Sequence, residues 1–162
     1  SHKEIINKTM NDPAWGLNFQ YEVLKYRTEK LKGMNQFVTD RSPLDNLVYF
    51  LMQNTHLVSE EQTEDYISAC KEAMKLFNGI ICLPFSKFIP LENDGQRVNN
   101  KYYQMSVNNL FQIGSYLMQD CLTGLYGDTI QIWDFEKRKK MANNIIDKIK
   151  NHEEKSDSNS PS

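Results

Sequence analysis

The spacing of apolar residues along the chain predicts a series of amphipathic helices. In these segments apolar side chains recur every three or four residues, and charged side chains occupy the positions between them. The predicted helices cover residues 4–10, 15–32, 43–53, 59–77, 100–121 and 135–150. Gly33 is expected to end the second helix, because glycine readily adopts the left-handed conformation that often follows a helix.

Three shorter apolar runs predict β-strands at residues 36–39, 79–83 and 129–133. The run around Ile80 and Ile81 is continuous, which is typical of a strand buried on both faces of a parallel sheet. Strands that alternate with helices favour an α/β fold with a parallel sheet. We therefore expect a single domain over residues 1–150, followed by a polar, disordered tail over residues 151–162.

Composition and charge restrict the class of protein. The 162-residue chain is 40% hydrophobic, with a formal net charge of −2, so it fits one soluble domain, and its charge does not favour a nucleic-acid partner. No apolar run is long enough for a membrane span, and the first residues do not resemble a secretion signal. These features predict a cytoplasmic protein without a membrane partner.

The cysteines and histidines do not predict a metal site. Cys70, Cys82 and Cys121 are odd in number and widely spaced, so we interpret them as reduced thiols in or near the core. The three histidines have no partner at metal-ligand spacing.

The end of the first predicted strand carries the strongest candidate chemistry. Asp40, Arg41 and Ser42 follow this strand, and Asp45 lies in the helix that begins at Pro43. The carboxyl ends of strands in α/β sheets are common ligand sites. Asp40 could accept a hydroxyl proton or bind Mg²⁺, and Arg41 could hold a phosphate.

Each of these residues also has a structural interpretation. Asp40 or Ser42 could be the N-cap of the following helix, and Arg41 could form a structural salt bridge. Asp45 could simply be a favourable acid in the first turn of that helix.

The second predicted helix places Trp15, Phe19, Gln20 and Arg27 at a spacing that resembles the P-loop nucleoside and nucleotide kinases. This group includes deoxyribonucleoside kinases, nicotinamide riboside kinases and phage kinase-like ATPases. The resemblance implies that Gln20 and Arg27 grip a base, with Trp15 and Phe19 beside it. Without the resemblance, these side chains would be assigned to a solvated helix face or to core packing.

The resemblance extends to Asp40-Arg41-Ser42, which matches the acidic strand end of these kinases, and to the segment 92–97. It implies that Asp40 is the base or the Mg²⁺ partner, and that Ser42 and Asp45 contact the substrate. It also implies that Arg97 lies on a lid that reaches the transferred phosphate, with Lys101 as a further ATP-binding residue and ATP and Mg²⁺ as cofactors. Arg97 could otherwise be an ordinary exposed loop cation.

The chain departs from this family in one respect. It contains no Gly-x-x-x-x-Gly-Lys-Ser/Thr motif, whose backbone and lysine bind the phosphates of ATP. We therefore expect a three-layer kinase-like parallel sheet with helices on both faces, whose first strand and P-loop precede residue 1. A missing N-terminal segment or a homodimer would complete the sheet, and this chain alone would be inactive.

The sequence thus predicts ATP-dependent phosphoryl transfer to a nucleoside, a nucleotide or a related hydroxyl acceptor. One alternative is a non-catalytic nucleotide-binding or interaction protein that has lost the P-loop. Another is a kinase that modifies hydroxylated bases in phage DNA. The sequence does not identify the acceptor.

Overall fold

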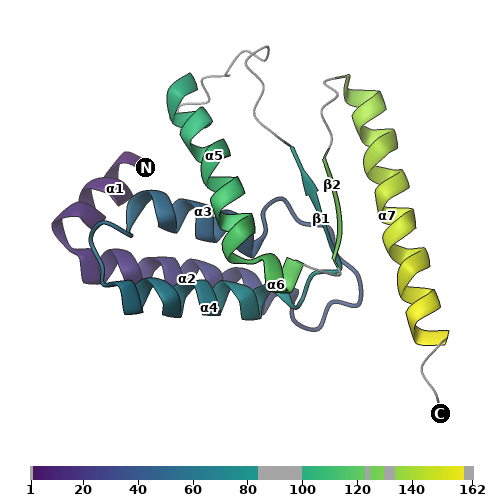
Figure 1. The fold of residues 1–162 in the computed structure, drawn as a ribbon, viewed down its shortest axis with the longest axis horizontal. Helices are drawn as coiled ribbons and strands as arrows, with labels where there is room; N and C mark the ends of the chain where they lie inside the picture. The colour runs from purple at the N-terminus through teal and green to yellow at the C-terminus, as the bar shows by residue number, and fades with distance from the viewer. Residues whose placement is uncertain (1, 84–99, 123–124, 130–133, 159–162) are drawn as a thin grey trace. The chain divides into compact units, whose positions relative to one another are not determined.

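The computed structural model describes residues 2–83, 100–122, 125–129 and 134–158 (Figure 1). Its elements, in chain order, are α1 (His2–Asn11), α2 (Pro13–Leu31), α3 (Pro43–Gln53), α4 (Glu60–Met74), β1 (Gly79–Cys82), α5 (Lys101–Leu117), α6 (Gln119–Leu122), β2 (Tyr126–Thr129) and α7 (Phe135–Ser158). The chain divides into two compact units. The first unit comprises residues 1–76 and 85–123, and the second comprises residues 77–84 and 124–162.

The first unit is a helical bundle in which α3 is the central helix. It contacts α2, α4 and α5, and its apolar side chains point to more than one side. Leu44, Leu47, Val48 and Phe50 are each no more than 2% exposed. A helix that is apolar around most of its circumference has to be surrounded by other elements, so the composition of α3 dictates its central position.

The core of this unit is built around Phe50. Its ring stacks on that of Tyr66 of α4 with 4.2 Å between centroids, and the ring of Tyr21 of α2 meets Tyr66 edge-on at 5.0 Å. On the other side of α3, Gly114 allows a close approach of α5, because a Cβ atom there would lie only 3.0 Å from Leu44 Cδ1. The core thus joins α2, α3 and α4, and α5 packs on α3.

Local signals set the ends of the helices. The carboxylate of Asp12 accepts a hydrogen bond from the backbone N–H of Trp15 at the start of α2, and Gly33 follows the end of that helix with a φ of 85°. Ser59 and Gln62 form a capping box at the start of α4. These caps satisfy backbone groups that a helix end leaves without partners.

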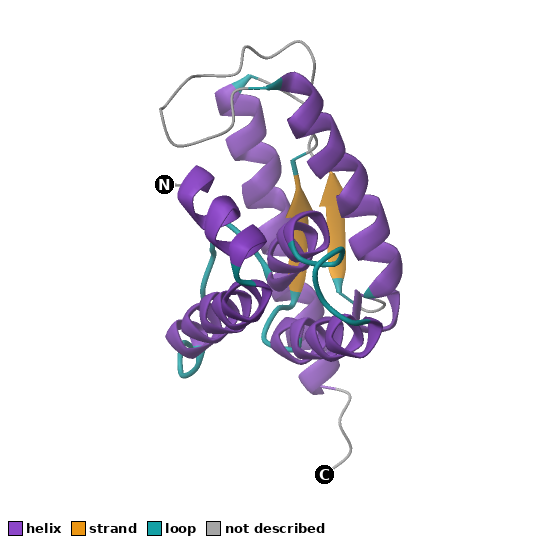
Figure 2. Cartoon of the chain, turned by 90° about the vertical axis from the view of Figure 1, so that its left-hand side faces the viewer, coloured by secondary structure: helices purple, strands orange, loops and turns teal. Residues whose placement is uncertain are grey.

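The second unit contains a pair of parallel strands and α7 (Figure 2). Gly79 of β1 is opposite Tyr126 of β2, and Cys82 is opposite Thr129. On α7, Ile145 is only 2% exposed, whereas Phe135 at the start of the helix is 65% exposed.

The predicted fold class is wrong. The described chain is predominantly helical, and its only strands form a two-stranded sheet instead of the central layer of a three-layer α/β fold. The strand predicted at residues 79–83 is present as β1, and the next strand begins at Tyr126, earlier than predicted. Residues 130–133 lie outside the described part of the chain.

The strand predicted at residues 36–39 is absent: this segment has no regular secondary structure, and Val38 is 80% exposed. A strand needs a neighbouring strand that pairs with its backbone N–H and C=O groups, and the sheet of the described residues contains β1 and β2 but not this segment. At the other end of the chain, α7 continues to Ser158, so residues 151–158 are helical where the sequence predicts disorder. Within the described residues, no helix is both long and apolar enough to cross a membrane.

Candidate functional site

Arg41, Ser42, Asp45 and Tyr49 form a polar group at the N-terminal end of α3, which we call the Arg41 cluster. Arg41 Nη1 donates a hydrogen bond to the hydroxyl of Tyr49 at 3.1 Å and lies 3.7 Å from Asp45 Oδ1. The guanidinium carbon lies 5.3 Å from the centroid of the Tyr49 ring. The side chain of Arg41 is 32% exposed and that of Asp45 is 19% exposed. The cluster therefore presents a fixed, partly accessible guanidinium.

Asp45 holds the first turn of α3 in place. Its Oδ2 accepts hydrogen bonds from the backbone N–H of Ser42 at 2.8 Å and from the Ser42 hydroxyl at 3.0 Å. Ser42 is the N-cap of α3. The structural interpretations of Ser42, Asp45 and the Arg41 salt bridge therefore all hold, whatever further role these residues have. Since Ser42 occupies the N-cap, Asp40 does not cap this helix.

Asp40 is the exposed acid of this region. In the described part of the chain its carboxylate makes no hydrogen bond or ion pair, although its charge acts on Arg41. An exposed carboxylate without a structural partner remains available to a ligand.

The pKa of Arg41 reflects these neighbours. Partial burial acts to lower the pKa, but the hydrogen bond with Tyr49 and the charges of two aspartates, Asp45 and Asp40, raise it above the ordinary value. The guanidinium is therefore charged at any physiological pH.

The backbone of Arg41 is strained, with a φ of 92°, in the left-handed region that favours glycine. We expect Arg41→Gly to be more stable than Arg41→Ala by about 1 kcal/mol, because both variants lose the guanidinium contacts but only glycine relieves the backbone. Urea denaturation of the two variants measures this difference.

Lys32 supplies the matched control, because its φ is −60°. There we expect the opposite order, with Lys32→Ala more stable than Lys32→Gly. The same order at both positions would contradict a strained conformation at Arg41.

Gln20 and Arg27, the two predicted base-binding residues, contact asparagines at the two ends of α3: Asn54 is its C-cap, and Asn46 lies in its first turn. Gln20 Nε2 donates to Asn54 Oδ1 at 3.3 Å, and Arg27 Nη1 donates to Asn46 Oδ1 at 2.9 Å. These two contacts show that α2 and α3 run antiparallel. Asn46 directly follows Asp45, so the contact of Arg27 lies one residue along α3 from the Arg41 cluster.

Gln20 lies inside the core. Gln20 is 5% exposed and Asn54 is completely buried, and Asn54 Nδ2 has no hydrogen-bond partner within the part of the chain that the structure describes. The hydroxyl of Tyr66 donates to the backbone carbonyl of Gln20, and burial raises the pKa of Tyr66. In this conformation Gln20 is not accessible to a ligand.

Trp15 and Phe19 stack on each other at the opposite end of α2, with 5.2 Å between ring centroids. Lys8 of α1 lies over the Trp15 ring at 4.1 Å. Trp15 and Arg27 are twelve positions apart on one helix, or about 18 Å at 1.5 Å per residue. The two aromatic rings are therefore separate from the Arg41 cluster.

The two predicted ATP-binding residues, Lys101 and Arg97, lack a described contact with the Arg41 cluster. Lys101 is exposed at the start of α5, with its ammonium group 4.9 Å from the centroid of the Tyr102 ring. Arg97 lies outside the described residues. Among the residues that the structure describes, no three His, Cys, Asp or Glu side chains gather into a metal-binding group.

Tyr49 and Asn46 are members of this region that the sequence did not single out. Asp45, Tyr49 and Gln53 are spaced four residues apart and lie on one face of α3, a pattern that could have identified Tyr49. Tyr103 of α5 lies beside this face. Burial and Tyr49 raise its pKa, and a hydrogen bond with Gln53 and the charge of Arg41 act in the opposite direction.

Comparisons with protein-family models, curated proteins and solved structures found no match to this chain. The assignment of a function therefore depends on the geometry of the Arg41 cluster and its neighbours.

Proposed function

We propose that this chain supplies the acceptor side of an ATP-dependent phosphoryl transfer to a nucleoside, a nucleotide or a related hydroxyl compound. One observation carries the proposal: Arg41, Ser42 and Asp45 gather at the end of α3, next to the exposed carboxylate of Asp40. Arg27 reaches the same region through Asn46. Asp40, Arg41, Ser42 and Asp45 come from one short segment of the chain, and Arg27 comes from α2.

The charges and exposures of these residues suit different parts of the reaction. The hydroxyl oxygen of the acceptor attacks the γ-phosphorus of ATP, the bond to the β-phosphate oxygen breaks, and ADP leaves. Asp40 takes the proton of the attacking hydroxyl, and the guanidinium of Arg41 stabilises the charge on the transferred group. Asp45 and Ser42 position Arg41 by fixing the turn that carries it.

The residues present fit Mg²⁺ only in part. Magnesium in phosphoryl-transfer sites is usually bound by one or two carboxylates together with substrate phosphates. Asp40 is exposed and can supply one such carboxylate, whereas Asp45 Oδ2 already accepts two hydrogen bonds. Bound Mg²⁺ would neutralise phosphate charge beside Asp40. The proposal also requires another polypeptide segment to bind the ATP phosphates, because these 162 residues contain no P-loop motif.

The acceptor could contact Arg27 and Arg41 directly, but not Gln20. Arg27 is exposed and Arg41 is partly exposed, whereas Gln20 is buried against Asn54. A base that uses Gln20 would need α2 and α3 to separate locally. The geometry therefore favours recognition of a phosphate or sugar oxygen by the two arginines.

The test is an acceptor screen on the native polypeptide that contains this chain. It combines MgATP with deoxyribonucleosides, nucleoside monophosphates and nicotinamide riboside, and it measures ADP and phosphorylated acceptor together. Formation of both products in equal amounts with one acceptor class supports the proposal. If calorimetry detects acceptor binding but no transfer occurs, the result supports the non-catalytic binding protein. If the chain shows no binding and no transfer, both functions are rejected.

A further inference from the structure

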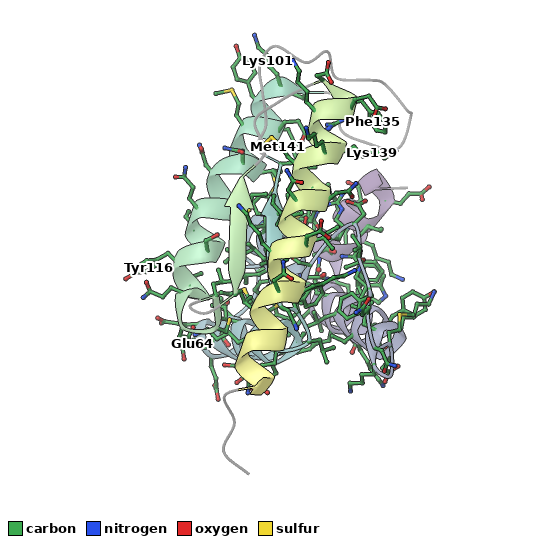
Figure 3. All side chains as sticks on the ribbon, turned by 90° about the vertical axis from the view of Figure 1, so that its right-hand side faces the viewer. Glu64, Lys101, Tyr116, Phe135, Lys139 and Met141 are labelled. Atoms are coloured by element: carbon green, nitrogen blue, oxygen red, sulfur yellow. The ribbon has the colours of Figure 1, made fainter. Side chains whose placement is uncertain are left out.

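Helix α5 has a second apolar face that no described residue covers. Its inner face packs on α3 through Val107 and Gly114, which are buried. The outer face carries four large side chains with these exposures: Tyr102 66%, Met105 47%, Ile113 50% and Tyr116 70%. Figure 3 shows Tyr116 pointing away from the ribbon of α5. With Asn109, also exposed, these residues form what we call the outer stripe.

The positions of these residues make the stripe continuous. Successive residues of an α-helix are rotated by about 100°, so all five members fall within about 40° of the direction of Asn109. Val107 and Gly114 fall on the opposite side, which agrees with their burial. The outer stripe is therefore one narrow line of side chains along the helix.

The helix that carries the stripe has no charged residue between its two ends. Between Lys101 and Asp120 the sequence contains no Lys, Arg, Asp or Glu. Exposed helix faces are normally rich in these residues, whereas the centres of protein interfaces are depleted of charge and enriched in Tyr and Met. The composition of the stripe therefore matches an interface and not a solvated face.

The order of residues along the stripe identifies its partner. Tyr102 and Tyr116 lie seven residues before and after Asn109, and Met105 and Ile113 lie four residues before and after it. The stripe therefore reads as Tyr, apolar, Asn, apolar, Tyr in both directions. Such a sequence is self-complementary under a two-fold axis, which is the symmetry of most homodimers.

We propose that the outer stripe of α5 binds the outer stripe of a second copy of this chain, with the two helices antiparallel and Asn109 on the two-fold axis. Tyr102 then faces Tyr116 of the second copy, and Met105 faces Ile113 of the second copy. The two Asn109 side chains face each other, where a single polar pair fixes the register of paired helices. Lys101 at the start of one helix lies near the negative end of the other helix.

The first measurement is the mass of the full chain by sedimentation equilibrium over a range of concentrations. We expect association to twice the chain mass of 19.0 kDa. Met105→Glu and Ile113→Lys should each weaken the dimer by roughly tenfold or more, because each places two charges against apolar side chains. Ser68→Glu and Asn18→Lys, at exposed positions on α4 and α2, should leave the dimer unchanged.

An equimolar mixture of the Met105→Glu and Ile113→Lys chains then tests the antiparallel register. In the proposed dimer the new glutamate of one chain faces the new lysine of the other, and the remaining Met105–Ile113 contact is intact, so the mixture should dimerise. In a parallel dimer the two charges would not meet. A monomeric wild-type chain, variants without effect, or a mixture that stays monomeric would each overturn the proposal. Dimerisation of the mixture also shows that both variants are folded.

Discussion

Asp40→Asn is expected to lower turnover by about 10²- to 10⁴-fold in the native polypeptide, with little change in the KM of the acceptor. The amide has nearly the shape of the carboxylate but cannot accept the proton of the attacking hydroxyl. In the described chain the Asp40 carboxylate makes no hydrogen bond or ion pair, so the folded structure should not change. Steady-state kinetics with the acceptor found in the screen measures both constants.

Asp147→Asn is the matched control, because Asp147 is an exposed carboxylate on α7. We expect this variant to keep the wild-type turnover. The free energy of unfolding of both variants should be within about 0.5 kcal/mol of that of the wild type. Wild-type turnover in Asp40→Asn would exclude Asp40 as the base. A large increase in KM with unchanged turnover would instead assign Asp40 to binding alone.

Phe50→Ala is expected to lower the free energy of unfolding by about 3–5 kcal/mol. Phe50 has no exposed surface, and its ring stacks on Tyr66 at the junction of α2, α3 and α4. Alanine would leave a cavity that these three helices cannot fill without moving. Typical domains have about 5–15 kcal/mol of stability in total, so this loss is a large fraction of it. Urea denaturation followed by circular dichroism measures the loss.

Phe135→Ala is the control for this change, because Phe135 is 65% exposed. We expect this substitution to change the free energy of unfolding by no more than about 0.5 kcal/mol. Phe50→Leu should lose an amount of unfolding free energy between those of Phe50→Ala and Phe135→Ala, because leucine fills part of the space of the ring. If Phe50→Ala lost no more stability than Phe135→Ala, the central position of α3 would be wrong.

Several helices were predictable because their signals are local. The helix predicted over residues 43–53 is present with those bounds, since Pro43 suits the first turn and the apolar spacing marks its length. Gly33 follows the end of α2 as predicted, with a positive φ. The helix predicted over residues 100–121 is interrupted at Met118, which is completely buried.

The fold class was not predictable from the same signals. The apolar run at residues 36–39 looks like a strand, but a strand exists only where another strand pairs with it. The run at residues 79–82 finds that partner in β2. An apolar pattern describes what one segment can bury, whereas the sheet depends on segments distant in the sequence.

The candidate site divides in the same way. The sequence by itself determined the helix that carries the Arg41 cluster and the placement of Asp40, Arg41, Ser42 and Asp45 around its first turn, because these depend on neighbours in the chain. Only the tertiary structure decided that Gln20 is buried against Asn54, that Arg27 reaches Asn46, and that Tyr49 holds Arg41. The physical reason is that burial and long-range hydrogen bonds depend on which helix faces pack together, and helical periodicity identifies an apolar face without identifying its partner.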